Sequence, residues 1–162
     1  MKQSSRPKAF ARNALLFVTL PCFTSAQVST GRPQHILTDQ FTILTSVSTI
    51  PDRVLDRFRQ LTKNDGVLLA EPGAYFQVTD VIVNSELPGR RLIFAGASKE
   101  YCFIHYEMGG IAHTYFVILF RLAGDGATFE WGARSDHAFR DLGELRKAIA
   151  EKRLSENPRG WW

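Results

Sequence analysis

The sequence predicts an α+β fold in a single domain, with an antiparallel meander of four to six strands flanked by an N-terminal and a C-terminal helix. Two segments with helical spacing of apolar residues lie near the ends of the domain, and short runs rich in aromatic and β-branched residues fill the region between them. Gly and Pro turns separate those runs by a few positions only. Such short links join antiparallel neighbours, because a parallel crossover needs about a dozen residues or more.

The N-terminal residues 1–26 have the composition of a secretory signal peptide. Four basic residues and no acidic residue precede an apolar run at residues 14–23, and small residues close the segment at Thr24, Ser25 and Ala26. We expect cleavage after Ala26 and export of the mature chain to the periplasm or the medium. The apolar run is shorter than the roughly 20 residues that cross a bilayer, so we expect no membrane insertion once this leader is removed.

Charge argues against two classes of partner. Residues 1–26 contain four of the 20 Lys and Arg and none of the 16 Asp and Glu, which leaves 16 basic and 16 acidic residues in the mature chain. A balanced domain lacks the basic field that binds a phosphate backbone or an anionic membrane. We therefore expect no nucleic-acid partner, and a protein or a small molecule as ligand.

Residues 27–35 are polar and contain Gly and Pro, which predicts a flexible leading segment before a domain at residues 36–154. Alternating residues at 41–47 permit a first strand. Thr49 as the cap, followed by Pro51 and Asp52, predicts the start of the first helix. An apolar stripe continues this helix to Asn64, at Val54, Leu55, Phe58 and Leu61.

The predicted strands follow at residues 75–83, 91–97, 101–107, 113–122 and 127–132. Asp141, with Glu144 three residues later, then predicts the capped start of a final helix that ends near Leu154. Residues 155–162 contain Pro and Gly and are expected to form a loose tail. The chain shows no internal repeat.

The richest polar cluster is His105, Glu107 and His113, on two strands around one turn. A loop of three or five residues places all three on one sheet face, whereas a two-residue loop sends His113 to the other. The odd loop also separates apolar from mixed aromatic and polar side chains, so we favour it. Cys102 then lies on the core face, where a cysteine is a small hydrophobe.

The same face predicts the candidate ligand contacts, which are Tyr101, Phe103, Tyr115 and Arg121. His105, Glu107 and His113 are candidate catalytic residues, since a carboxylate can orient an imidazole for proton transfer. Their spacing matches no named metal motif, so we predict no metal and no cofactor. The neighbouring Arg90 and Arg91 point to opposite faces of a strand, which argues for two solvated charges rather than an anion clamp.

These observations lead to three functional hypotheses. The first, a small exported binding or interaction module, follows from the aromatic and polar face and from the lack of a recognised catalytic motif. The second is a small exported enzyme, a hydrolase or a metal-dependent protein, that uses the His, Glu and His cluster. The third is a subunit of an envelope assembly. The sequence favours binding over catalysis and leaves the ligand and the oligomeric state open.

Overall fold

The computed structural model describes residues 33–63, 69–79, 84, 86–111 and 113–156. Its sheet has six strands in the order β1-β2-β3-β4-β5-β6, and every neighbouring pair is antiparallel. The strands are β1 (Thr42–Leu44), β2 (Arg90–Ala97), β3 (Tyr101–Met108), β4 (Thr114–Ala123), β5 (Gly126–Ser135) and β6 (Ser155–Glu156). The helices are α1 (Gln34–Thr38), α2 (Asp52–Thr62) and α3 (Leu142–Ala150), with a 3-10 turn at Val47–Thr49.

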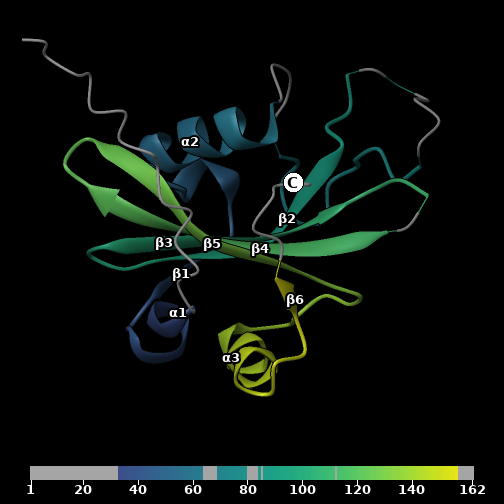
Figure 1. The fold of residues 1–162 in the computed structure, drawn as a ribbon. Coiled ribbons are helices and arrows are strands. Elements are labelled where there is room, and N and C mark those ends of the chain that lie inside the picture. The colour runs from purple at the N-terminus through teal and green to yellow at the C-terminus, as the bar shows by residue number, and fades with distance from the viewer. Residues whose placement is uncertain (1–32, 64–68, 80–83, 85, 112, 157–162) are drawn as a thin grey trace, which may run out of the picture.

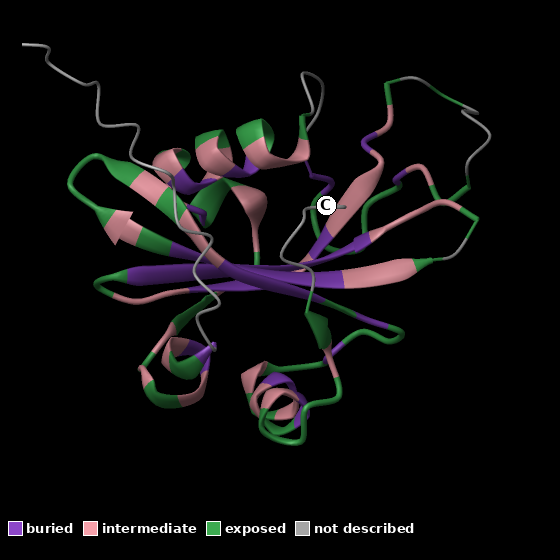
Figure 2. Cartoon of the chain, in the orientation of Figure 1, coloured by how far each residue is buried: buried purple, intermediate pink, exposed green. Residues whose placement is uncertain are grey.

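The predicted α+β meander, with helices towards both ends of the chain, is confirmed. Helix α2 covers one face of the sheet, and α1 and α3 lie against the other (Figure 1). The middle of the sheet is buried between these layers, whereas the hairpin tips are exposed (Figure 2). Both edge strands are short, with three residues in β1 and two in β6, which gives a neighbouring chain little backbone to pair with.

Two apolar clusters fill the space between the layers. Val54 and Phe58 of α2 pack with the β3 side chains of Cys102 and Ile104 on one face. On the other face, buried residues of α1 and α3 pack against residues of β2, β3, β4 and β5: Ile36, Phe94, Tyr101, Phe103, Val117, Leu119, Trp131, Leu145 and Ala148. Side chains of a strand alternate between faces, so β2, β3, β4 and β5 each supply both clusters.

A β-bulge at Ile93 changes this alternation in β2. Leu92 pairs with Tyr106 and Phe94 pairs with His105, so Ile93 is the additional residue in β2. Leu92 belongs to the cluster that packs against α2, which we name the α2 cluster. Phe94, two positions later, belongs to the cluster on the opposite face of the sheet. The bulge therefore turns Phe94 to the α3 face and bends the strand at this point.

Helix α2 is amphipathic, as its stripe predicts, but it begins later than expected. It starts at Asp52 after Pro51, and no side chain caps it. The Thr49 hydroxyl instead donates to the carbonyl oxygen of Ser46 at 2.7 Å, so the prediction of Thr49 as the cap is wrong. The hydroxyl therefore bonds within the local 3-10 turn and does not cap the helix, because a Thr side chain can bond to a nearby backbone carbonyl instead.

Helix α3 begins as predicted and ends earlier. The Asp141 carboxylate accepts the Glu144 backbone N–H at 2.8 Å, which confirms the cap. The helix ends at Ala150 in a Schellman motif, in which Lys152 N donates to Ile149 O at 3.0 Å and Arg153 N donates to Ala148 O at 2.9 Å. Lys152 has the left-handed φ of 55° that this motif requires.

Three other segments of the chain also differ from the prediction. The described residues 75–79 contain no strand, and residues 80–83 lie outside the described part of the chain. Backbone bonds instead hold these residues as a loop, because Gln77 N donates to Pro88 O and Val78 O accepts from Gly110 N. Helix α1 starts at Gln34, inside the predicted leading segment, and Ser155–Glu156 pair with β5 as β6. The predicted signal peptide and residues 157–162 lie outside the described residues.

Candidate functional site

The β3–β4 hairpin has the register that the sequence favours. Met108 pairs with Thr114 and Glu107 pairs with Tyr115, which leaves residues 109–113 as a five-residue loop. An odd loop places the side chains of His105 and Glu107 on the same face as Tyr115. Cys102, on the opposite face, is fully buried in the α2 cluster, and burial raises the pKa of its thiol to about 12.

His105 belongs to the core rather than to an open site. Its Nδ1 lies 2.9 Å from the carbonyl oxygen of Phe116, and its Nε2 accepts the backbone N–H of Phe139 at 3.0 Å. Both ring nitrogens are therefore occupied by backbone groups, in the tautomer that carries its proton on Nδ1. Burial lowers the pKa of His105 to about 4, against the opposing effect of the Phe116 bond. A fully buried, neutral imidazole with two partners joins two chain segments and has no nitrogen left for a ligand.

Glu107 and His113 do come together, with Arg91 as a third member. Glu107 Oε1 accepts Arg91 Nε–H at 2.5 Å, and Glu107 Oε2 lies 2.6 Å from His113 Nε2. The Glu107 side chain is 8 % exposed, so a carboxylate this buried needs both partners. These three side chains form what we name the charged cluster.

Aromatic rings hold the charged cluster in place. The Arg91 guanidinium lies 4.5 Å from the centroid of the Phe76 ring, and the same ring meets His113 edge-on at 5.9 Å. Tyr115 stacks on His113, with the two ring centroids 5.0 Å apart. Arg91 Nη1 also donates to the carbonyl oxygen of Ala74 at 3.0 Å. The loop that contains Ala74 and Phe76 is therefore attached to the cluster by side chains as well as by backbone.

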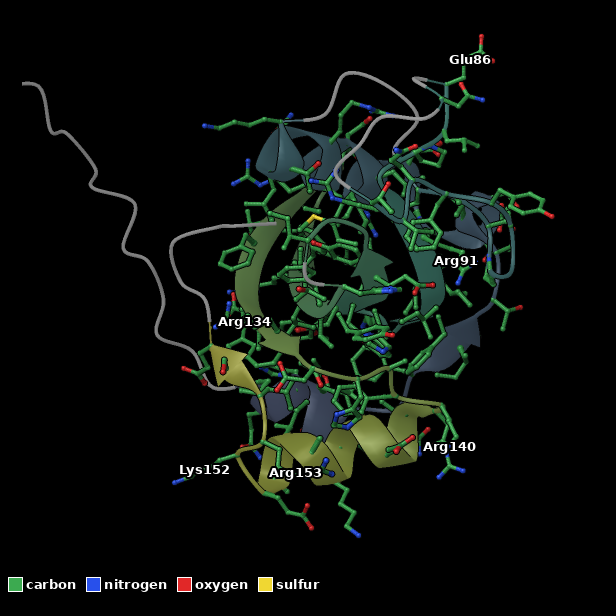
Figure 3. The ribbon with its side chains drawn as sticks, turned by 90° about the vertical axis from the view of Figure 1, so that its right-hand side faces the viewer. Glu86, Arg91, Arg134, Arg140, Lys152 and Arg153 are labelled. Atoms are coloured by element: carbon green, nitrogen blue, oxygen red, sulfur yellow. The ribbon has the colours of Figure 1, made fainter. Side chains whose placement is uncertain are left out.

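A cavity of about 330 Å³ opens beside the charged cluster. We name it the Glu107 cavity. Its lining includes the loop before Phe76, the bulge in β2 and the loop after β5, with the residues Pro72, Gly73, Arg91, Leu92, Ile93, Glu107, Tyr115 and Ala138. In Figure 3, Arg91 lies above Arg140, near the N-terminal end of α3, while Lys152 lies at the opposite end of that helix.

Large apolar side chains are exposed beside this site. Tyr75 is 90 % exposed, Ile111 is 94 % exposed and Val78 is 49 % exposed. We name these three residues the loop-end surface. Backbone bonds join the loops that carry them, because Gly110 N, next to Ile111, donates to Val78 O at 3.0 Å. The remaining large apolar residue that is exposed in the described chain is Ile43 of β1, 43 % exposed.

The other predicted ligand contacts lie elsewhere. Phe103 is fully buried, and Tyr101 is 6 % exposed and stacks on His35 of α1 with ring centroids 3.8 Å apart. Arg121, which pairs with Tyr101 in the sheet, is exposed at the other end of the hairpin. Helices α1 and α3 cover most of the face that the sequence predicts as mixed, so of the four predicted contacts only Tyr115 lies at the charged cluster.

Two parts of this site were missed by reasoning from the sequence. Arg91 is an ion-pair partner of Glu107, although the sequence suggests a solvated charge. The loop with Phe76 was predicted to be a strand. Arg91 pairs with Glu107 in the β2–β3 register, so a correct strand alignment would have placed the two opposite charges together.

A larger cavity, of about 490 Å³, lies between α1 and α3. Trp131, Leu37 and Ile149 are among its lining residues, and so are Pro33 and Glu156, the first and last residues that the structure describes. It contains none of the site residues that the sequence predicts. Among the described residues, no three His, Cys, Asp or Glu side chains are grouped as a metal site would need, and no helix is long and apolar enough to span a bilayer.

Comparisons with known protein families, with curated proteins and with solved structures find no match to this chain.

Proposed function

We propose that this protein is an exported binding module that contacts a protein partner through the loop-end surface, Tyr75, Val78 and Ile111. The observation that supports the proposal is that these three exposed apolar side chains lie on two loops whose backbones are bonded together. Scattered apolar residues are normal on a protein surface, whereas several together are typical of an interaction site. Tyr75 and Ile111 are each exposed over about nine-tenths of their surface, so a partner could bury a large apolar area on them.

Backbone contacts hold the loops that carry these residues against one another. A Cβ atom at Gly109 would lie 1.9 Å from the Gln77 carbonyl oxygen, so the hairpin loop touches the backbone of residues 77 and 78 directly. Gly109 N also donates to Gly89 O at 3.3 Å, and Gln77 N donates to Pro88 O at 2.9 Å. Three loops are therefore fastened to one another. A partner that binds such a support loses less free energy in ordering it than one that binds free loops.

The experiment begins with a variant in which a photo-reactive amino acid replaces Tyr75. The variant is produced in the organism that makes the protein and is cross-linked to its neighbours there. A protein cross-linked from Tyr75 is then purified, and its dissociation constant for the unmodified chain is measured by calorimetry. Truncation of an interface hot spot costs about 2 kcal/mol or more, so we expect Ile111→Asp to weaken the complex at least about thirtyfold.

Ile43→Asp is the matched control, because Ile43 is the other large exposed apolar residue and lies on β1. It should leave the dissociation constant within about twofold. Equal losses for Ile43→Asp and Ile111→Asp would contradict the proposed surface, and so would a cross-linked protein that does not rebind when purified.

A second candidate function depends on one contact, the 2.6 Å pair of Glu107 Oε2 and His113 Nε2. In the neutral tautomer that donates to Glu107, the His113 Nδ1 keeps its lone pair and has no hydrogen-bond partner among the described residues. A carboxylate and an imidazole in this arrangement can accept a proton from water or a hydroxyl group. Hydrolysis of activated esters that is lost in His113→Gln and kept in His137→Gln would support an enzyme; equal rates in both variants would remove this candidate.

A further inference from the structure

We propose that residues 157–162 fold back on the domain and place the indole ring of Trp161 or Trp162 in the cavity of about 490 Å³ between α1 and α3. We name this space the α1–α3 cavity. The proposal does not depend on the loop-end surface, since none of the three residues of that surface is among the described residues that line the cavity.

The α1–α3 cavity has mainly apolar walls. Six of the nine described residues that line it are apolar, so an apolar group fits it better than a charged one: Pro33, Leu37, Trp131, Ile149, Ala150 and Leu154. Ile149 and Leu154 also pack against the buried cluster that contains Trp131. Its volume lies in the range of roughly 300–1,000 Å³ that is typical of ligand sites, which is ample for one indole ring. A ring placed here would extend the core of this face.

The two helical walls of the cavity are fixed relative to each other. Helices α1 and α3 lie on the same face of the sheet (Figure 1). Arg146 of α3 donates from Nε to the carbonyl oxygen of Ile36 in α1 at 2.8 Å, and from Nη2 to the carbonyl oxygen of Asp39. A group that enters a cavity with fixed walls loses little free energy in ordering them.

The direction of β6 brings the chain to this cavity. Glu156, the last residue of β6, pairs with Ala133, and the two strands are antiparallel. The chain therefore leaves Glu156 towards the earlier residues of β5, among them Trp131. Glu156 itself lines the cavity, and its Oε1 accepts the Trp131 Nε1–H at 3.3 Å. Residues 157–162 thus begin at the wall of the cavity that we propose they fill.

These six residues contain two of the three tryptophans in the chain, Trp161 and Trp162. Trp161 is five residues beyond Glu156, which allows a separation of up to roughly 17 Å when extended, so either ring can return to the cavity. Pro158 and Gly160 are residues that favour turns. Residues 27–32 also adjoin the cavity, through Pro33, but they contain no aromatic residue. The composition of the two segments therefore favours residues 157–162 as the occupant.

Two forces favour this occupant over a loose tail. A tryptophan ring has a large apolar area, and its N–H bonds to an acceptor when it is buried, for which Gln34 and Glu156 of the lining supply oxygen atoms. A short tether also gives the rings an effective concentration in the millimolar range, so even a weak contact is well populated.

The test is NMR of the full chain with labelled Ile and Leu methyl groups. We expect nuclear Overhauser effects between the methyl groups of Leu37 or Ile149 and the indole protons of Trp161 or Trp162. Each ring is assigned by its Trp→Phe variant. These effects should be lost in Ala150→Arg, which places a charged side chain at an exposed position of the lining. Gln60→Arg is the matched control and should retain them, because it adds the same side chain at an exposed position of α2.

The wild-type spectrum decides the proposal even if a variant fails to fold. Absence of any such effect from both rings would overturn it, and so would effects on the same methyl groups from residues 27–32 instead. Effects seen only between differently labelled chains in a mixed sample would also overturn it, because the occupant would then be a second copy. Effects that persist in a folded Ala150→Arg variant would place the rings outside the cavity.

Discussion

The His105 ring bridges the backbones of Phe116 and Phe139, with its Nδ1 bonded to the Phe116 carbonyl at 2.9 Å and its Nε2 to the Phe139 N–H at 3.0 Å. Phe116 lies in the central strand β4, and Phe139 lies in the segment that leads into α3. One buried imidazole thus fastens the C-terminal helical layer to the middle of the sheet. The bond from the Phe139 N–H requires the neutral ring, because a protonated Nε2 cannot accept it, and this dependence gives the first prediction.

Acid should weaken the fold through His105. Its pKa falls from 6.5 to about 4 on folding, so between these two pH values the unfolded chain binds more protons than the native one. The contribution of His105 to the free energy of unfolding should therefore be fully present above pH 6.5. It should decrease as the pH falls to about 4, by up to about 3 kcal/mol. Urea denaturation at pH 7.0, 5.5 and 4.5 measures it.

Carboxylates titrate in part of the same range, so the His105 effect is isolated with His105→Gln, which cannot gain a proton. The variant should be less stable than the wild type at pH 7 and should lose less stability between pH 7 and pH 4.5. A stability difference between the two proteins that stays constant over this range would contradict the assignment.

Cys102 should be inert in the native protein. Its side chain is fully buried among the α2 cluster and burial raises its thiol pKa to about 12, so almost no thiolate forms at neutral pH. The chain has a second cysteine, Cys22, so the test uses a Cys22→Ser variant of the full chain. In this variant a thiol-specific disulfide reagent should react only as fast as the chain opens, and faster when urea is added. Rapid reaction in native buffer would mean that Cys102 is accessible.

Much of the fold could be predicted because its signals are local. The turns between strands and the Asp141 cap act over a few residues, and the stripe of Val54 and Phe58 repeats at helical spacing. The hairpin register was predicted from a wider pattern, the separation of Cys102 and Ile104 from His105 and Glu107. The prediction of a strand at 75–83 was wrong for the described residues 75–79. These residues pair with no neighbouring strand and instead form a loop whose backbone is bonded to Pro88 and Gly110.

The end of α3 offers a test of its backbone strain. Lys152 has a φ of 55°, the left-handed conformation in which glycine is preferred at the end of a helix. Lys152→Gly should therefore raise the free energy of unfolding, by about 0.5 to 1 kcal/mol. Lys147→Gly is the matched control within α3 and should lower it by about 1 kcal/mol. A loss of stability in both variants would show that the Lys152 side chain contributes more than its strain costs.

The contact between loops predicts opposite outcomes for two neighbouring glycines. Gly109→Ala places a methyl group 1.9 Å from the Gln77 oxygen, so one loop must move, at a cost of roughly 1–3 kcal/mol. At Gly89 an added Cβ meets nothing within 4 Å, and Gly89→Ala should be tolerated. Thermal unfolding of the two variants measures the difference. Equal melting temperatures would mean that the loops are not in close contact.

The site was harder to predict than the fold, because its members come together through long-range packing. The sequence identifies Glu107, His113 and Tyr115, which lie around one hairpin. It does not identify Arg91, whose pairing depends on the β2–β3 register, and it groups His105 with the others because residues on one face of a strand look equivalent. The hydrogen bond from the Phe139 backbone N–H, which is far from His105 in the sequence, distinguishes His105 as a core residue.

The proposed binding surface of Tyr75, Val78 and Ile111 can be tested by a single affinity. This affinity is the dissociation constant of the purified cross-linked partner for the wild type, Ile111→Asp and Ile43→Asp. We expect a loss of about thirtyfold or more for Ile111→Asp and a change of about twofold or less for Ile43→Asp. Unchanged affinity in Ile111→Asp, with the fold intact by circular dichroism, would contradict it.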